Sequence, residues 1–205
     1  MLYQEFKNDF FELACFSGHQ VFAWRGKFDK NNLGRWVQQG LLLRLKPGLY
    51  CFPEYLGKPG FEFYVANRMY RPSYISLHSA LAFYGMIPEA VVQVTSVSSL
   101  KTADFTNRFG QFSYQSMKPE YLFGYGSVKL TDGRDILLAD PEKALLDLLY
   151  LFPFYNSKTE MTELRLDEDF IRENLNEEKL WQYSSQFNIG TLEKRVRLFL
   201  KAYSR

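Results

Sequence analysis

The sequence predicts an α+β protein, in which an N-terminal winged helix-turn-helix precedes a mixed α+β domain with helices in its C-terminal part. Three observations lead to this prediction. Residues 3–52 show helical apolar spacing and then two strand-like runs around the turn Lys46-Pro47-Gly48. Residues 53–60 contain two prolines and two glycines, which is typical of a linker. The rest of the chain has strand-like alternation in its middle and helical spacing at both ends.

The first elements follow from local signals. Tyr3, Phe6, Phe10, Leu13 and Phe16 recur at helical spacing, so a first amphipathic helix is expected over 3–16, ended by Ser17-Gly18. The segment 19–26 is short and fits either a turn of helix or a strand.

A second helix is better defined. Asp29 can cap a helix that begins near Lys30, and Gly40 lies where a left-handed residue ends a helix. Leu33, Trp36 and Val37 give this helix one apolar stripe. Strand-like runs at 41–45 and 49–52 then predict a β-hairpin.

The linker divides the chain into predicted domains 1–56 and 61–205. In the second domain, helices are expected at 61–70, from Ser76 to Tyr84 with Gly85 ending it, and after Asp140-Pro141, with Ser76 and Asp140 as caps. Strands are expected at 91–97 and near 109–115, 121–130 and 135–139, and C-terminal helices at 167–175, 177–187 and 191–203.

Composition bounds the class of protein. Hydrophobic residues make up 46% of the 205 residues, with 19 Phe and 14 Tyr, which is enough for a folded core. The net charge is only +2, but residues 1–60 hold eight Lys/Arg against five Asp/Glu. Residues 61–152 hold eight against nine, and residues 153–205 hold nine of each. The positive excess therefore lies in the N-terminal part, as expected for a small DNA-binding module.

The chain shows no membrane or disulfide signal. Cys15 and Cys51 are too few for a disulfide framework and lie among apolar residues, so two reduced thiols in a core are expected. No run reaches the roughly 18 apolar residues of a membrane span, and the first residues lack the pattern of a signal peptide. We therefore expect a cytoplasmic protein with no membrane partner.

The second helix and the hairpin supply the candidate site. Asn and Gln can make bidentate contacts with adenine and Arg with guanine, and Lys or Arg on a hairpin can reach phosphates. Five basic residues lie within 27–46, beginning with Lys27, against one acid, Asp29. The candidate DNA-binding residues are Lys30, Asn31, Asn32, Arg35, Gln38, Gln39, Arg44 and Lys46. The alternative is an ordinary solvated helix followed by an ordinary hairpin.

Catalytic sites are not indicated. His78 lies between serines, but no nucleophile motif accompanies it, and a structural histidine is expected. A metal-dependent nuclease site is one interpretation of five residues, Asp132, Asp135, Asp140, Glu142 and Lys143. Glu142 and Lys143 are adjacent on a predicted helix, however, so their side chains diverge by about 100°. We expect no enzyme activity, no catalytic residue, no metal and no cofactor.

The second domain carries three longer motifs, at residues 71–81, 84–89 and 139–147, and the first carries shorter ones at 35–37, 40–42 and 48–50. Together they resemble the AbiEi family of bacterial antitoxins, and the shorter motifs resemble that family's winged-helix part. The likeness runs from about residue 20 to 155 and leaves the role of the C-terminal helices open. It implies a transcriptional regulator of a type IV toxin–antitoxin system, encoded beside a nucleotidyltransferase-like toxin. Such proteins bind inverted repeats in their own promoter and counter the toxin without a stable complex.

The residues and the resemblance together predict one of two functions. The first is a DNA-binding autorepressor and antitoxin, with Asn31, Asn32, Arg35, Gln38 and Gln39 in the major groove and Lys30, Arg44 and Lys46 on phosphates. Because the patch is small, a homodimer on an inverted repeat of double-stranded DNA is expected. The alternative is an interaction module that binds a partner, such as the toxin, directly, with the winged helix used for dimerisation.

Overall fold

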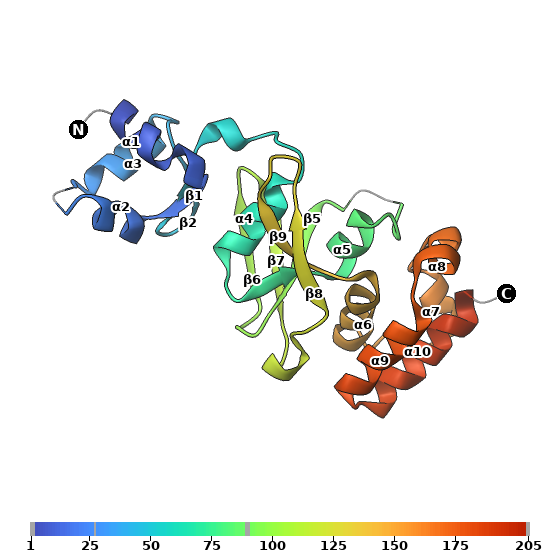
Figure 1. Cartoon of the computed structure of the whole chain (residues 1–205). Helices are drawn as coiled ribbons and strands as arrows, with labels where there is room; N and C mark the ends of the chain where they lie inside the picture. Colours follow the sequence, from blue (N-terminus) through green and yellow to red (C-terminus); the bar gives the residue numbers. More distant parts are fainter. Residues whose placement is uncertain (1–2, 27, 89–90, 204–205) are drawn as a thin grey trace.

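A computed structural model describes residues 3–26, 28–88 and 91–203 of the chain (Figure 1). Within these ranges the protein is α+β, with ten α-helices, a three-stranded sheet and a six-stranded mixed sheet. The three-stranded sheet belongs to the N-terminal part, and the C-terminal helices lie at the opposite end of the molecule (Figure 1). None of the helices in the described residues is long and apolar enough to cross a membrane.

The N-terminal part places three helices around a small antiparallel sheet. Its elements are α1 (Tyr3–Phe10), the 3-10 turn η1 (Phe11–Leu13), β1 (Cys15–Ser17), α2 (Gly18–Trp24), α3 (Asn31–Gln38), β2 (Leu43–Lys46) and β3 (Leu49–Cys51). The sheet order is β1-β3-β2, and both pairings are antiparallel. The predicted hairpin is thus present as β2 and β3, and β1 pairs with β3 on the side away from β2.

The expected first helix over 3–16 is too long. It ends at Phe10, and Ala14, with φ +56°, turns the chain into β1, where Phe16 pairs with Tyr50. Both arrangements bury Phe16, so the apolar spacing alone does not distinguish them. The ambiguous segment 19–26 is helical as α2, because Ser17 and Gln20 form a reciprocal capping box at its start.

Aromatic side chains fill the core of the N-terminal part. Phe6 is fully buried, with its ring centroid 4.8 Å from that of Phe10 and 4.7 Å from that of Trp36. Burying each side chain of this size contributes roughly 1.5–3 kcal/mol. Trp36 lies on α3, so this helix is held by the same cluster that α1 and β1 build.

The predicted linker is packed rather than extended. Its first residues form the 3-10 turn η2 (Pro53–Tyr55), and the Tyr55 ring stacks on Phe61 with centroids 4.7 Å apart. The Arg134 guanidinium lies 4.7 Å from the Tyr55 ring and also donates to the Glu12 carbonyl at 3.4 Å. Contacts of both parts therefore converge on Tyr55.

The second part is built on the six-stranded sheet, with order β6-β7-β5-β4-β9-β8. Its elements are α4 (Phe61–Met69), β4 (Ser73–Ile75), α5 (Leu77–Phe83), β5 (Gln93–Ser98), β6 (Ala103–Asn107), β7 (Gly110–Ser116), the 3-10 turn η3 (Pro119–Tyr121), β8 (Tyr125–Lys129), β9 (Asp135–Ala139) and α6 (Pro141–Leu151). β5 pairs in parallel with β7, and β4 with β9, whereas the remaining pairs are antiparallel.

Helices cover both faces of this sheet (Figure 1). α4 packs on one face, where the buried Tyr114 hydroxyl donates to the Ala66 carbonyl at 2.7 Å. α5 packs on the other, where Ser79 and Thr95 exchange backbone and hydroxyl hydrogen bonds. The predicted helices at 61–70 and after Asp140 are confirmed. The short strands β4 and β6 were not expected from the sequence.

The C-terminal helices pack against α6. They are α7 (Lys158–Thr162), α8 (Glu168–Asn174), α9 (Glu177–Phe187) and α10 (Gly190–Tyr203). The expected helices at 167–175, 177–187 and 191–203 are confirmed to within a residue, and α7 is additional. Arg195 of α10 donates to the Leu149 carbonyl of α6 at 2.7 Å. These helices therefore cover α6, which itself packs against β9 of the sheet.

Two predicted caps serve other purposes. The Ser76 hydroxyl donates to the buried Asp147 carboxylate at 2.8 Å instead of capping α5. The Asp140 carboxylate caps no backbone amide of α6 and accepts from the Tyr183 hydroxyl at 2.9 Å. Both side chains join elements far apart in sequence, which local spacing cannot reveal. The prediction that Gly85 ends this helix is confirmed, since α5 ends at Phe83 and Gly85 has φ +81°.

Candidate nucleic-acid interface

The candidate interface is centred on α3, whose two faces differ sharply. Leu33 and Trp36 are buried, whereas Asn31, Arg35 and Gln38 are exposed. At about 100° per residue, these three exposed side chains fall within about 60° of one another, opposite the buried stripe. The helix therefore presents two amide side chains and one guanidinium on a single solvent-facing strip, flanked by Asn32 and Gln39.

Both ends of α3 are fixed as the sequence predicts. Asp29 Oδ1 accepts a hydrogen bond from the Asn31 backbone amide at 3.0 Å, so one free amide of the first turn is satisfied. Gly40 has φ +72°, and Leu41 and Leu42 donate to the Trp36 carbonyl at 2.8 and 3.2 Å. The helix thus holds its polar strip in a defined orientation.

The basic side chains of α3 are only weakly neutralised. Arg35 Nη2 lies 4.0 Å from Asp29 Oδ2, and both side chains are more than half exposed, at 57% and 54%. An exposed pair of this length is worth little, roughly 0–1 kcal/mol, so Arg35 can exchange its partner for another acceptor. Lys30 Nζ lies 5.0 Å from the Phe22 ring centroid. Lys27 lies outside the described residues.

The hairpin residues have different surroundings. Arg44 of β2 is exposed and lies opposite Tyr50 of β3. Lys46, beyond a register shift in the same strand, has its Nζ 6.0 Å from the ring centroid of Phe105 on β6. Asn107, also of β6, donates to the Leu45 carbonyl at 3.3 Å. The structure therefore places Lys46 against the second sheet, whereas Arg44 is exposed to solvent.

The acidic residues considered for a metal site are engaged with basic partners. Asp132 pairs with Arg134 at 2.5 Å and Asp135 with Lys129 at 3.3 Å. Lys179 bridges Asp140 and Glu142 at 2.8 and 3.3 Å. Among the described residues, no group of three or more His, Cys, Asp and Glu side chains has the arrangement to hold a metal ion.

His78 lies in the first turn of α5, half-buried, with its ring centroid 6.3 Å from that of Phe152. Burial lowers the pKa of its imidazole below the usual value, because desolvation disfavours the charged form. The expected structural role agrees with these apolar surroundings.

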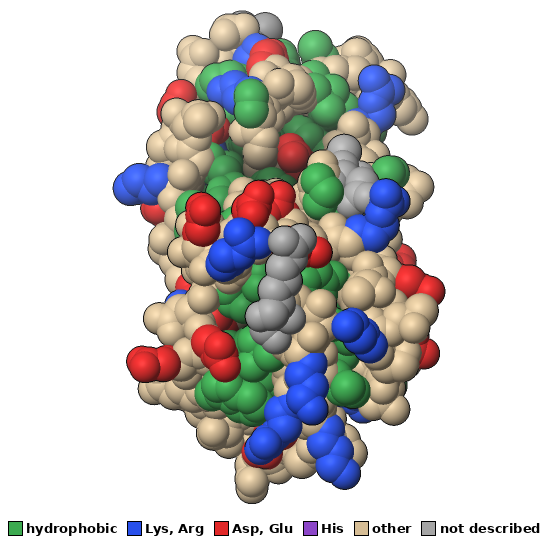
Figure 2. Space-filling view, turned by 90° about the vertical axis from the view of Figure 1, so that its right-hand side faces the viewer, with side chains coloured by type: hydrophobic (Ala, Val, Ile, Leu, Met, Phe, Trp, Pro, Cys, Tyr) green, Lys and Arg blue, Asp and Glu red, His purple; other side chains and the backbone are tan. Residues whose placement is uncertain are grey.

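A second basic strip, on α10, was missed at the sequence level. Lys194, Arg197 and Lys201 are exposed and spaced by three and four residues, so they share one face of the helix. None of the three forms an ion pair with any residue that the structure describes. The face over the C-terminal helices carries gathered Lys and Arg side chains in its lower part (Figure 2). The net charge of zero over 153–205 conceals this strip, because the acidic residues are concentrated before α10.

Comparison of the whole chain with models of known protein families and with curated proteins gave no match. The candidate interface is therefore defined by the geometry of α3 and the exposure of its polar side chains.

Proposed function

We propose that the protein is a DNA-binding autorepressor and antitoxin, and that its N-terminal part is a winged helix-turn-helix with α3 as the recognition helix. The single observation that supports this best is the exposed strip Asn31–Arg35–Gln38 on a helix whose opposite face is anchored in the core. A recognition helix needs these two properties together, since base edges are read by side chains held in a fixed direction.

The order of elements supports the same proposal. The chain runs α1, β1, α2, α3 and then the β2–β3 hairpin, and the sheet order is β1-β3-β2. This order of elements supports the proposed winged helix, in which Lys46-Pro47-Gly48 would form a short wing. Gly48 has φ +78°, and its carbonyl accepts from the Gly18 amide at 3.0 Å, so the tip of the hairpin is tied to the start of α2.

In the proposed complex, Asn31, Asn32, Arg35, Gln38 and Gln39 face the major groove. Lys30, Arg44 and Lys46 contact phosphates, with Lys46 contributing least because its amine lies against Phe105. Two copies of the chain occupy the halves of an inverted repeat, because one short helix reads only a few base pairs.

The antitoxin part of the proposal rests on the motif resemblance. The toxin is a nucleotidyltransferase-like protein of the same operon, and the chain counters it without forming a stable complex. Expression of the neighbouring reading frame with and without this protein tests this directly. Rescue of growth by the intact protein is expected, and continued growth arrest contradicts the antitoxin role.

DNA recognition is tested by the affinity of the purified protein for its own promoter fragment and for random DNA of equal length. Selective binding to the promoter is expected, and it should depend on each half of the inverted repeat. Equal affinity for both fragments contradicts the repressor role.

One observation favours the alternative of a direct protein-interaction module. Val92 is 88% exposed and Phe83 40%, and both line a groove of about 370 Å³ beside α5. Exposed apolar side chains that line one groove are typical of interaction surfaces. Stoichiometric co-purification of the toxin with the wild-type protein, lost in Val92→Asp, would establish this alternative.

A further inference from the structure

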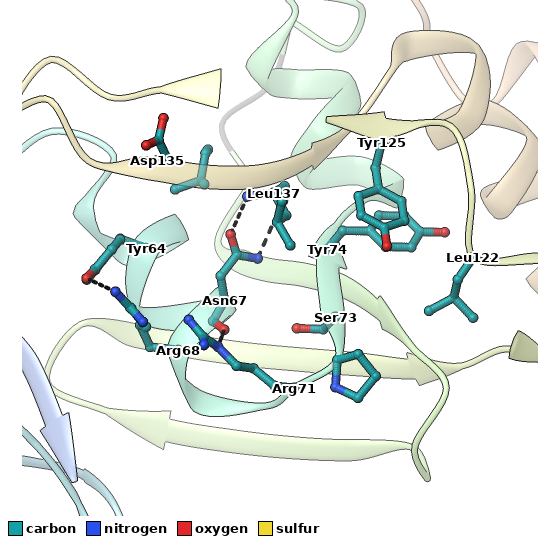
Figure 3. Close-up of a pocket in the computed structure, with 12 residues that line it drawn as sticks. Tyr64, Asn67, Arg68, Arg71, Ser73, Tyr74, Leu122, Tyr125, Asp135 and Leu137 are labelled. Carbon is teal, nitrogen blue, oxygen red and sulfur yellow. Dashed lines mark hydrogen bonds between the residues drawn. The ribbon is translucent and has the colours of Figure 1, made fainter. Parts of the chain in front are cut away.

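A cavity of about 540 Å³ lies between α4 and the strands β4, β8 and β9, apart from the α3 interface (Figure 3). Cavities of about 300–1,000 Å³ are the usual size of small-molecule sites. Its lining is cationic at one end, where Arg68 and Arg71 lie, and aromatic at the other, where Tyr74 and Tyr125 lie (Figure 3). Asp135 also lines the cavity, and its carboxylate pairs with Lys129 at 3.3 Å. A ligand that fits both ends must therefore carry an anionic group and a planar group.

The cationic end holds two guanidinium groups without a counter-ion. Arg68 donates to the Tyr64 hydroxyl at 2.6 Å, and Arg71 Nε donates to the Asn67 carbonyl at 3.0 Å. Within the part of the chain that the structure describes, neither pairs with a carboxylate. Partial burial and the charge of Arg68 both lower the pKa of Arg71, so the two cations lie close enough to repel each other. An anion placed between them would relieve that repulsion and accept several charge-assisted hydrogen bonds.

The backbone around these arginines is rigid. The Asn67 side chain accepts from the Leu137 amide at 2.6 Å and donates to the Leu137 carbonyl at 3.4 Å. It therefore pairs with the β9 backbone beside the Ile75–Leu138 pairing of β4, as a neighbouring strand would. This ties α4, which carries Arg68, to the floor of the cavity and presets the cationic end.

The aromatic end is also preset. The rings of Tyr74 and Tyr125 stack with centroids 4.3 Å apart and planes 8° from parallel. Tyr74 is fully buried, and its hydroxyl is fixed by Asp147 at 2.9 Å and by Lys143 at 3.0 Å. Tyr125 is 38% exposed and Leu137 40%, so this end offers an aromatic ring and an apolar side chain to a planar group.

We propose that this cavity binds a free mononucleotide, with its phosphate between Arg68 and Arg71 and its base against Tyr125. A nucleotide combines the anion and the flat ring that the two ends select. Bidentate guanidinium contacts suit phosphate oxygens, and stacking on tyrosine tolerates different bases. The assignment is independent of the DNA-binding role of α3.

The test is calorimetric titration of the full-length protein with AMP and GMP, beside adenosine and inorganic phosphate. The nucleotides should bind at least tenfold more tightly than either fragment, since each fragment engages one end only. Arg71→Gln and Arg68→Gln should each weaken binding by about ten- to a hundredfold, the loss expected for a charge-assisted hydrogen bond. Tyr125→Ala should weaken it by about tenfold, whereas Tyr125→Phe should retain it.

Arg108→Gln is the matched control, because Arg108 is exposed between β6 and β7 and does not line the cavity. Its affinity should equal that of the wild type, and circular dichroism should show that every variant is folded. No nucleotide binding at millimolar concentration, equal affinity of a folded Arg71→Gln protein, or equal affinity for inorganic phosphate would each overturn the proposal.

Discussion

Lys143 and Asp147 form an ion pair one turn apart on α6, and neither side chain is exposed to solvent. The Asp147 carboxylate also accepts from the hydroxyls of Tyr74 and Ser76, at 2.9 and 2.8 Å. Burial raises the pKa of Asp147 and lowers the pKa of Lys143, since desolvation disfavours both charges. Through Tyr74, the pair joins α6 to β4. Its desolvation penalty is offset only while both charges keep their partners.

Lys143→Met is expected to lower the free energy of unfolding by about 3–5 kcal/mol, because Asp147 is left buried without its cation. The double variant Lys143→Met/Asp147→Asn should be more stable than the single variant. In the double variant, the amide oxygen at position 147 can still accept from the hydroxyls of Tyr74 and Ser76, and no buried charge is left without a partner. Urea unfolding measures both changes. A double variant less stable than Lys143→Met would show that the charge itself is not the source of the loss.

Gly124 lies close to both α6 and α9, so there is little room for a side chain at this position. It has φ +67°, and an added Cβ would lie 2.9 Å from Tyr183 Cε2 and 3.0 Å from Lys143 Cβ. Gly124→Ala therefore combines a left-handed backbone, costing roughly 1–2 kcal/mol, with overpacking that costs roughly 1–3 kcal/mol.

Gly133→Ala is the control for Gly124→Ala, since Gly133 has φ +83° but nothing within 4 Å of an added Cβ. Thermal unfolding should show a clearly larger loss for Gly124→Ala. Equal losses at the two positions would mean that the contacts with α6 and α9 add nothing to the backbone strain.

Cys15 and Cys51 face each other across β1 and β3 as buried free thiols. A hydrogen bond with Cys15 and burial raise the pKa of the Cys51 thiol, so its thiolate is scarce even in mildly alkaline solution. We expect negligible labelling of the native protein by a thiol-disulfide reagent between pH 7 and pH 9. Two thiols per chain should react once the protein is unfolded in denaturant. Rapid labelling of one thiol in the native state would contradict this placement.

The parts of the fold that depend on local chemistry could be predicted from the sequence. Asp29 and Gly40 mark the ends of α3, and Pro47-Gly48 marks the hairpin, because caps and turns need particular residues at particular positions. Apolar spacing was less decisive. Phe16 fits the helical stripe of α1 but lies on β1, where it contributes to the same core.

The parts that depend on tertiary contacts could not be predicted. Ser76 and Asp140 have the sequence context of caps, yet their oxygens bond to Asp147 and Tyr183. The strand β6 lies at the edge of its sheet, and only Ala103 and Phe105 carry its apolar alternation, which is too short to predict a strand. The Arg68–Arg71 cavity joins α4 to strands more than fifty residues later in the chain, and no local pattern marks it.

The proposed function requires that the exposed strip of α3 reads DNA. The measurement that tests this most directly is the affinity for the promoter fragment across a salt series, for the wild type, Arg35→Ala and Arg108→Ala. Each variant removes one exposed arginine, so the global charge changes equally.

Arg35→Ala should lose most of its preference for the promoter over random DNA, a change of about 1–3 kcal/mol if Arg35 contacts a base. Lys30→Ala and Arg44→Ala, measured in the same series, should instead reduce the log–log salt slope by about one each and keep the preference. An unchanged salt slope for Lys46→Ala would show that Lys46 contacts no phosphate. The assignment of α3 as the recognition helix would still stand. Equal behaviour of Arg35→Ala and Arg108→Ala would contradict the assignment of α3 as the recognition helix.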